Sequence, residues 1–452
     1  MKSVVLHIHT YLLLYVGIAI HVLFYVSALW TGWLDVFFSG SSTHYADPGI
    51  DFFQVVRGAW SWWHGGSLTG VALPSGQVYA PALHYAVNKN VYSPLFTIVL
   101  GTVLMLLAPQ DSYAAWILIK LLLDLLLISF FWKQVRGYKY GQLATFILLA
   151  SLDEYAELAA GQYHLVFNAC LLLFLMMQKR SQLGIILFYA ASILVKPVGL
   201  LFVPALVFKR HWRLALFALA LVVLATWPFL LNKSGMYYIN NLVKEFFHPD
   251  SPGPDQIMTL NALLRYSFRW PNTAYQAIQY AALALVLLLS ASKRTPLATS
   301  IFFSIAYFLL FYNLVYEYDW STLAYVLAIC VVFCPAFQTR TARICILLTC
   351  LPSCFLLLRL FHVDVSFNNH LGFHPGLVAW RWMVVSKIVP LLLLCGSVLA
   401  GDVVFFRKSR RLFCAPRKSG QPTAAECVCW PGENAASRVP TARTWLSHLA
   451  RR

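Results

Sequence analysis

The chain has 452 residues, of which 60% are hydrophobic and only 11% are charged, and its mean hydropathy is +0.67. Soluble globular domains carry about a quarter of their residues as charged side chains, so this composition excludes that class. The formal net charge is +17, but ten of the 34 Lys and Arg lie from residue 407 onward, and many others form short clusters between apolar runs. This distribution is typical of cytoplasmic loops of membrane proteins and argues against a nucleic-acid partner.

Apolar runs recur along the whole chain. The first, residues 4–30, is longer than a signal peptide and lacks a small-residue cleavage site, so we predict a retained membrane anchor. The other runs predicted to be helical are residues 113–132, 141–152, 164–178, 184–195, 198–208, 214–231, 273–291, 297–313, 320–337, 344–361 and 384–406. With every basic cluster placed in the cytoplasm, the pattern predicts an all-α polytopic membrane protein with about twelve transmembrane helices and both termini inside. Runs shorter than about 17 residues predict broken or half-spanning helices near the outer face.

A long loop, residues 31–112, lies on the outer side in this arrangement. Its apolar run 93–108 cannot cross completely, because the next run must descend to the cytoplasm, so we expect a re-entrant or interfacial helix. Pro48-Gly49 predicts a turn that places Asp51 at the start of an aromatic segment, residues 55–63, which suits an interfacial helix. Helix-end amides favour a carboxylate there, so Asp51 is either a structural N-cap or a functional group.

The positions of the acidic residues are an independent check on the predicted membrane topology. It places 13 of the 17 Asp and Glu on the outer side, and only Asp124 falls in the middle of a predicted helix. Lys196 precedes a proline within an apolar stretch, where a lysine either snorkels to the surface or meets an anion or carboxylate. His362, His370 and His374 match no standard metal-ligand spacing, so no metal is predicted.

These features together suit a phosphate-bearing lipid substrate. A carboxylate can deprotonate an acceptor hydroxyl, and a cation can hold a departing phosphate. A multi-spanning lipid or polysaccharide transporter or flippase is the alternative, although the sequence shows no inverted repeat of the transporter kind. A non-catalytic membrane scaffold is a third interpretation.

Several short motifs follow the first helix in a definite order. They are Asp51-Phe52, an aromatic helix ending at Gly65-Gly66, Tyr92-Ser93-Pro94, Gly161-Gln162 with Asn168, Lys196-Pro197 followed by Lys209-Arg210-His211-Trp212-Arg213, Gln256 to Asn261 with Arg265, and Glu317 to Asp319. Over roughly residues 1–400, this order resembles the C-type glycosyltransferase (GT-C) superfamily. Within it, the chain is most similar to glycosyltransferase family 87, the bacterial polyprenol-phosphate-mannose-dependent mannosyltransferases.

The resemblance implies a GT-C fold and an inverting sugar transfer. A mannose-like hexose would move from a polyprenyl-phosphate donor to a glycan or glycolipid acceptor on the outer face of the bacterial cytoplasmic (inner) membrane. Asp51 would be the general base, with Asp47 as runner-up, Lys196 would meet the donor phosphate, and Gln162 would meet donor or acceptor hydroxyls. The other residues expected to bind substrate are Tyr92, His164, Asn168, Gln256, Asn261, Arg265, Tyr318 and Asp319. The resemblance implies no metal and no other cofactor.

Two departures from the family pattern leave the acceptor open. The insertion between Gly66 and Tyr92 is long, and the turn at Tyr318-Asp319-Trp320 has no His where the family often has one.

We predict two domains. Residues 1–406 form the transmembrane glycosyltransferase domain, which contains the outer loop 31–112. Residues 407–452 form a basic cytoplasmic tail, which is Pro-, Ala- and Arg-rich without hydrophobic periodicity from residue 414 and is predicted to be disordered.

Overall fold

The protein is described by a computed structural model. The described residues are 2–31, 34, 52–68, 79, 92–177, 181–231, 236, 239–240, 258–312, 315–351, 365–368, 372–375 and 377–413. The chain divides into two compact units, Met1–Asp402 and Val403–Arg452, and all contacts below lie in the first unit. The predicted domain boundary after residue 406 stays a prediction.

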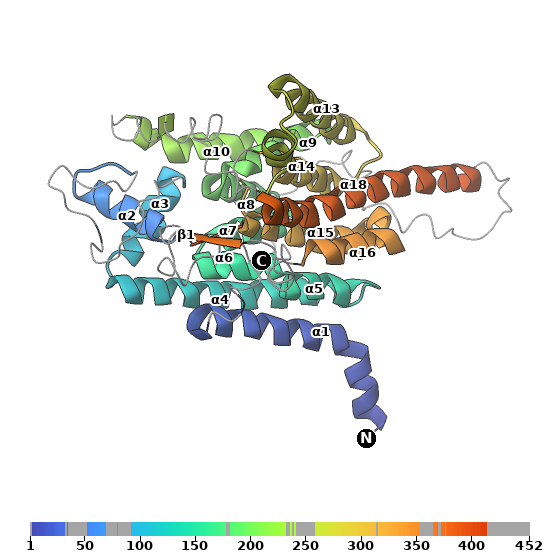
Figure 1. Cartoon of the computed structure of the whole chain (residues 1–452), viewed down its shortest axis with the longest axis horizontal. Helices are drawn as coiled ribbons and strands as arrows, with labels where there is room; N and C mark the ends of the chain where they lie inside the picture. Colours follow the sequence, from blue (N-terminus) through green and yellow to red (C-terminus); the bar gives the residue numbers. More distant parts are fainter. Residues whose placement is uncertain are drawn as a thin grey trace, which may run out of the picture. The chain divides into compact units, whose positions relative to one another are not determined.

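Nearly all described elements are helical (Figure 1). In chain order they are α1 (Lys2–Val26), η1 (Ser27–Thr31), α2 (Phe52–Trp63), α3 (Pro94–Leu104), α4 (Pro109–Val135), α5 (Gly141–Ala150), α6 (Leu152–Ala160), α7 (His164–Met176), α8 (Gln182–Val195), η4 (Pro197–Phe202), α9 (Val203–Phe208), α10 (Trp212–Leu230), α12 (Leu260–Ala262), η6 (Leu263–Ser267), α13 (Asn272–Ala291), α14 (Leu297–Phe311), η7 (Glu317–Trp320), α15 (Ser321–Phe333), η8 (Pro335–Gln338), α16 (Arg340–Thr349), β1 (Val365–Asn368), β2 (Gly372–Pro375) and α18 (Leu377–Phe413). The two short strands pair antiparallel, with Val365 opposite Pro375.

Five described helices are long and apolar enough to cross a membrane. They are Tyr11–Thr31, Pro109–Val135, Trp212–Phe229, Asn272–Ala291 and Val384–Gly401. These spans expose leucines such as Leu126, Leu224 and Leu288, which is the surface that a hydrocarbon environment requires. Six shorter apolar helices also coincide with predicted apolar runs. The helical class is therefore confirmed, and the length and composition of these helices are consistent with a membrane protein, while the count of about twelve crossings stays a prediction.

Helix α2, the first helix of the segment 31–112 described outside the first span, packs tightly on α3. It begins at Phe52, as the Pro-Gly turn predicted, but nine of its twelve residues are buried. A Cβ atom at Gly101 of α3 would lie 2.6 Å from the Ala59 Cβ and 2.7 Å from the Val55 carbonyl oxygen. The missing side chain at Gly101 therefore allows the two backbones to approach each other. The expected interfacial helix is thus largely covered by the protein itself.

Helix α6 lies in the interior, between α4 and α15 in Figure 1, and it carries three acidic residues. Every residue from Asp153 to Ala160 is buried. An unpaired buried carboxylate costs several kcal/mol, so these side chains need partners. Glu157 accepts a 2.7 Å bond from Lys120 of α4, and Asp153 forms an ion pair with Lys387 of α18. Two distant helices therefore each supply one buried cation to α6.

The third acid of α6, Glu154, has no ion pair among the described residues. Its Oε1 atom is buried without a hydrogen-bond partner in that part of the chain. Burial, and next the neighbouring Glu157 carboxylate, raise the pKa of Glu154 well above its usual value. Burial therefore favours the neutral form of the Glu154 side chain, and this form needs no third cation.

We predict that Gly101→Ala loosens the packing of α2 on α3. The added methyl group must displace α2 backbone or Ala59, and such overpacking costs about 1–3 kcal/mol. Thermal unfolding of the purified protein in detergent measures the loss. Gly396→Ala is the matched control, because nothing lies within 4 Å of a Cβ there and Ala favours the helix. Equal melting temperatures for Gly101→Ala and the wild type would contradict the close packing.

The two neighbouring glutamates of α6 should respond differently to amide substitution. Glu157→Gln removes the carboxylate that compensates Lys120, and breaking a buried pair costs about 3–5 kcal/mol. Glu154→Gln replaces a side chain whose neutral form burial already favours, so it should cost little.

The pH dependence of unfolding gives a second test of the raised pKa of Glu154. A raised native pKa means that stability is fully present below the unfolded pKa and falls as pH rises above it. Glu154→Gln has no carboxyl group at this position and loses no stability from its ionisation. As the pH rises from about 5 to about 8, the melting temperature of Glu154→Gln should therefore increase relative to that of the wild type. A constant difference across that range would show that Glu154 does not carry a proton.

Candidate functional site

The candidate site is built around the turn that joins α6 to α7. Gly161 ends α6 in the left-handed conformation, with φ of 67°. The Gln162 amide donates to the Glu157 carbonyl and the Gly161 amide donates to the Leu158 carbonyl, both at 3.1 Å. This pair of bonds is a Schellman motif, which reverses the chain direction after a helix. Helix α7 then begins at His164, so the turn presents residues 161–164 at one end of both helices.

Two residues one turn apart on α4 hold this turn from one side. The Trp116 Nε1 donates to the Gly161 carbonyl at 3.1 Å, and the Lys120 Nζ donates to the Gln162 carbonyl at 3.0 Å. Both side chains are fully buried. The turn carbonyls are therefore satisfied by the protein itself and not by solvent.

The same turn contacts two residues of the segment 31–112. The Tyr163 hydroxyl donates to the Phe52 carbonyl at 2.7 Å, and the Tyr92 hydroxyl donates to Gln162 Oε1 at 2.5 Å. All four residues are buried. Asp51 directly precedes Phe52 in the chain, although Asp51 itself lies outside the described residues.

A charged cluster starts at the last residue of the turn. His164 Nε2 lies 2.6 Å from Asp319 Oδ1, and Lys196 Nζ lies 2.9 Å from the same oxygen and also contacts His164 Nε2. The Tyr316 amide donates to the other carboxylate oxygen at 2.8 Å. Lys196 follows α8 and precedes Pro197, so three separate segments meet here. The lysine meets a carboxylate, one of the two environments that its position predicted.

Accessibility distinguishes the members of this cluster. The side chains of His164 and Asp319 are 2% and 3% exposed, whereas that of Lys196 is 19% exposed. The ammonium group of Lys196 is thus the most accessible charge of the three. It can meet an incoming anion while Asp319 keeps it oriented.

Two more predicted residues lie close to this cluster. The Tyr318 ring centroid is 5.2 Å from that of His164. Asn168, one helical turn beyond His164, donates to the Ser321 hydroxyl at 3.3 Å. The sequence motifs around residues 161–168, 196 and 318–319 therefore converge on one place.

The remaining predicted residues are less closely connected to it. Asn261 is buried in α12, and the Met258 amide bonds the Val315 carbonyl at 2.8 Å, which sets this segment beside the chain that enters η7. Arg265 is exposed in η6. Asp47, Asp51 and Gln256 lie outside the described residues, so their predicted roles stay predictions.

Sequence reasoning missed the two buried lysines that pair with acids of α6. Lys120 and Lys387 are both fully buried, and neither was predicted to matter. The available signal was their depth, because a lysine in the middle of an apolar helix is costly and needs a partner. No group of three or more His, Cys, Asp or Glu among the described residues is arranged to hold a metal ion.

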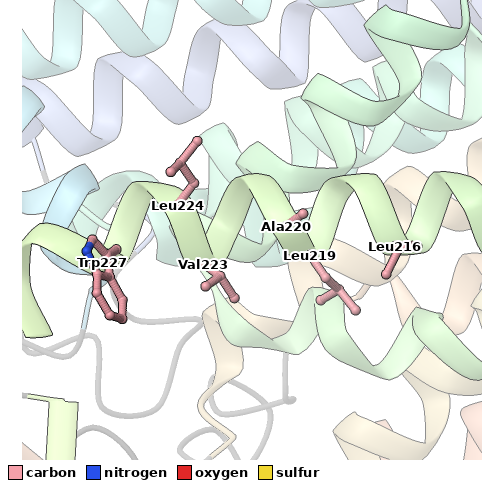
Figure 2. Close-up of a pocket in the computed structure, with 6 residues that line it drawn as sticks. All are labelled: Leu216, Leu219, Ala220, Val223, Leu224 and Trp227. Carbon is pink, nitrogen blue, oxygen red and sulfur yellow. The ribbon is translucent and has the colours of Figure 1, made fainter.

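The pocket shown in Figure 2 is a different kind of surface. It lies along one face of α10 and is lined by Leu216, Leu219, Ala220, Val223, Leu224 and Trp227. All six are apolar and come from one predicted span. Such a face suits contact with lipid and supplies no group for proton or phosphate chemistry.

The turn 161–164 and the charged cluster both lie within a segment that matches a known protein family. The sequence profile of glycosyltransferase family 87 matches residues 90–335, more than half of the chain, and this range includes Tyr92, the turn 161–164, Lys196 and Asp319. No curated protein matches the chain. The chain belongs to glycosyltransferase family 87.

Proposed function

We propose that this glycosyltransferase moves a mannose-like hexose from a polyprenyl-phosphate donor to a glycan or glycolipid acceptor. The observation that carries the proposal is the partly exposed Lys196 ammonium, held by Asp319 beside the turn 161–164. A fixed cation within an apolar helical protein suits a phosphate attached to a lipid. Family membership favours this reaction over a lipid or polysaccharide transporter, the alternative that the sequence left open.

The proposed setting is the outer face of the bacterial cytoplasmic membrane. The chain would be multi-pass with both termini in the cytoplasm. Support comes from the basic clusters between apolar runs and from the 13 of 17 acids that this arrangement places outside. The five long apolar helices supply lipid contact for a donor with a hydrocarbon tail.

In the proposed reaction, the acceptor hydroxyl loses its proton to the Asp51 carboxylate as its oxygen attacks the anomeric carbon of the donor sugar. The bond between that carbon and the phosphate oxygen breaks on the opposite face, so the configuration inverts. The electron pair leaves with the polyprenyl phosphate, and the Lys196 ammonium stabilises the negative charge that develops. Asp51 later releases the proton to solvent.

The turn 161–164 links the two proposed reacting groups. Tyr163 holds the carbonyl of Phe52, the neighbour of Asp51, and His164 lies against Lys196 and Asp319. Gln162 would bind sugar hydroxyls. The other residues proposed to bind substrate are Asp47, Tyr92, His164, Asn168, Gln256, Asn261, Arg265, Tyr318 and Asp319.

The general-base assignment is tested with Asp51→Asn. The amide cannot accept the proton, so kcat for transfer from a polyprenyl-phosphate sugar should fall by about 100- to 10,000-fold. Transfer of radiolabelled sugar in isolated membranes gives the rate, with expression checked by immunoblot. Asp111→Asn is the matched control, because Asp111 is exposed in the first turn of α4 and belongs to no proposed site.

Full transfer by Asp51→Asn would refute the base role. Loss of transfer in Asp47→Asn with activity retained in Asp51→Asn would move the role to the runner-up.

The outer location of the first loop is tested with Ser75→Cys in a chain whose ten native cysteines are replaced. A membrane-impermeant maleimide should label this cysteine in intact spheroplasts. A second variant that retains only Cys427, in the predicted cytoplasmic tail, should be labelled only after permeabilisation. The opposite pattern would overturn the proposed orientation.

A further inference from the structure

Lys120 is a buried lysine in the middle of α4, and its side chain is fully inaccessible. Its ammonium group donates to three acceptors: Glu157 Oε1 at 2.7 Å, the Glu157 carbonyl at 3.3 Å and the Gln162 carbonyl at 3.0 Å. An ammonium group has three hydrogens, so all of them are directed to this one region. A cation beside the last carbonyls of α6 is also favoured by the helix dipole.

Glu157 extends the effect of this lysine to the next helix. The Oε1 atom that binds Lys120 also accepts the Leu165 amide at 3.0 Å, in the first turn of α7. Lys120 therefore binds the last turn of α6 through the Glu157 carbonyl, the turn 161–164 through the Gln162 carbonyl, and the start of α7 through the shared carboxylate. Both ends of the turn 161–164 depend on one ammonium group.

Lys387 of α18 is the second buried lysine that pairs with an acid of α6, and it has a different set of acceptors. Its Nζ contacts the Asp153 carboxylate and donates to the carbonyls of Thr349 and Leu351. These residues lie at the start of α6 and at the end of α16, away from the turn in the chain. Lys387 and Lys120 thus resemble each other in burial and pairing but differ in what they hold.

We propose that Lys120 is a positioning residue for sugar transfer: it fixes the turn 161–164 and so directs Gln162 and His164 toward the substrates. This inference rests on the proposed function of the site. The competing view is that Lys120 only neutralises the buried Glu157 charge. The two views differ because only positioning requires the bonds from Lys120 to the Glu157 and Gln162 carbonyls.

The test compares Lys120→Met, the double variant Lys120→Met/Glu157→Gln, and Lys387→Met as matched control. The double variant contains no uncompensated carboxylate at residue 157, so it keeps the test meaningful if Lys120→Met alone fails to fold. In both Lys120 variants, kcat should fall about 10- to 100-fold, as expected when reacting groups are misplaced, with a much smaller change in donor KM. Lys387→Met should lower the melting temperature while folded protein keeps its kcat.

Hydrogen exchange measured by mass spectrometry gives a readout that does not depend on the donor. Amides of residues 161–165 should exchange faster in both Lys120 variants than in the wild type and in Lys387→Met. Recovery of kcat in the double variant would overturn the inference, as would unchanged exchange in this segment or an equal fall of kcat in Lys387→Met. A wild type without transfer from polyprenyl-phosphate sugars would refute the proposed function instead, and the exchange data would still decide whether Lys120 fixes the turn.

Discussion

The burial of an acidic helix is the constraint on which much of the interior depends. Helix α6 is buried from Asp153 to Ala160, and its three acids are at most 1% exposed, so water does not compensate their charge. Lys120 comes from the α4 span and Lys387 from α18, and each compensates one carboxylate. An unpaired buried charge costs several kcal/mol, so the docking of these two helices and the raised pKa of Glu154 both serve to keep α6 buried.

The same arrangement explains why a short turn can serve as the centre of a site. A four-residue connection usually gains little rigidity from its own sequence. Here its carbonyls are bound by α4, its tyrosine binds the start of α2, and its histidine meets Lys196 and Asp319. The precision of the site therefore comes from buried hydrogen bonds around the turn, and this precision suits a reaction whose rate depends on orientation.

Much of the architecture follows from the amino-acid sequence because apolar runs mark helices directly. The runs 214–231 and 273–291 correspond to α10 and α13 within two residues. The need of Lys196 for an anion or carboxylate could also be predicted, because its depth makes an unpaired charge costly. The identity of its partner could not, since Asp319 lies 123 residues away and only tertiary packing brings the two together. The depth of Lys120 carried the same signal, but its partner Glu157 comes from another helix, as does Gly101, on which the covering of α2 depends.

The hydrogen bond between Tyr163 and Phe52 has a mechanical consequence. It joins the first residue of α2 to the turn that carries Gln162 and His164, and both partners are buried. Pulling α2 away would leave a buried carbonyl without a donor, at a penalty of about 1–3 kcal/mol. A displacement of α2 is therefore less costly when the turn 161–164 moves with it as one body.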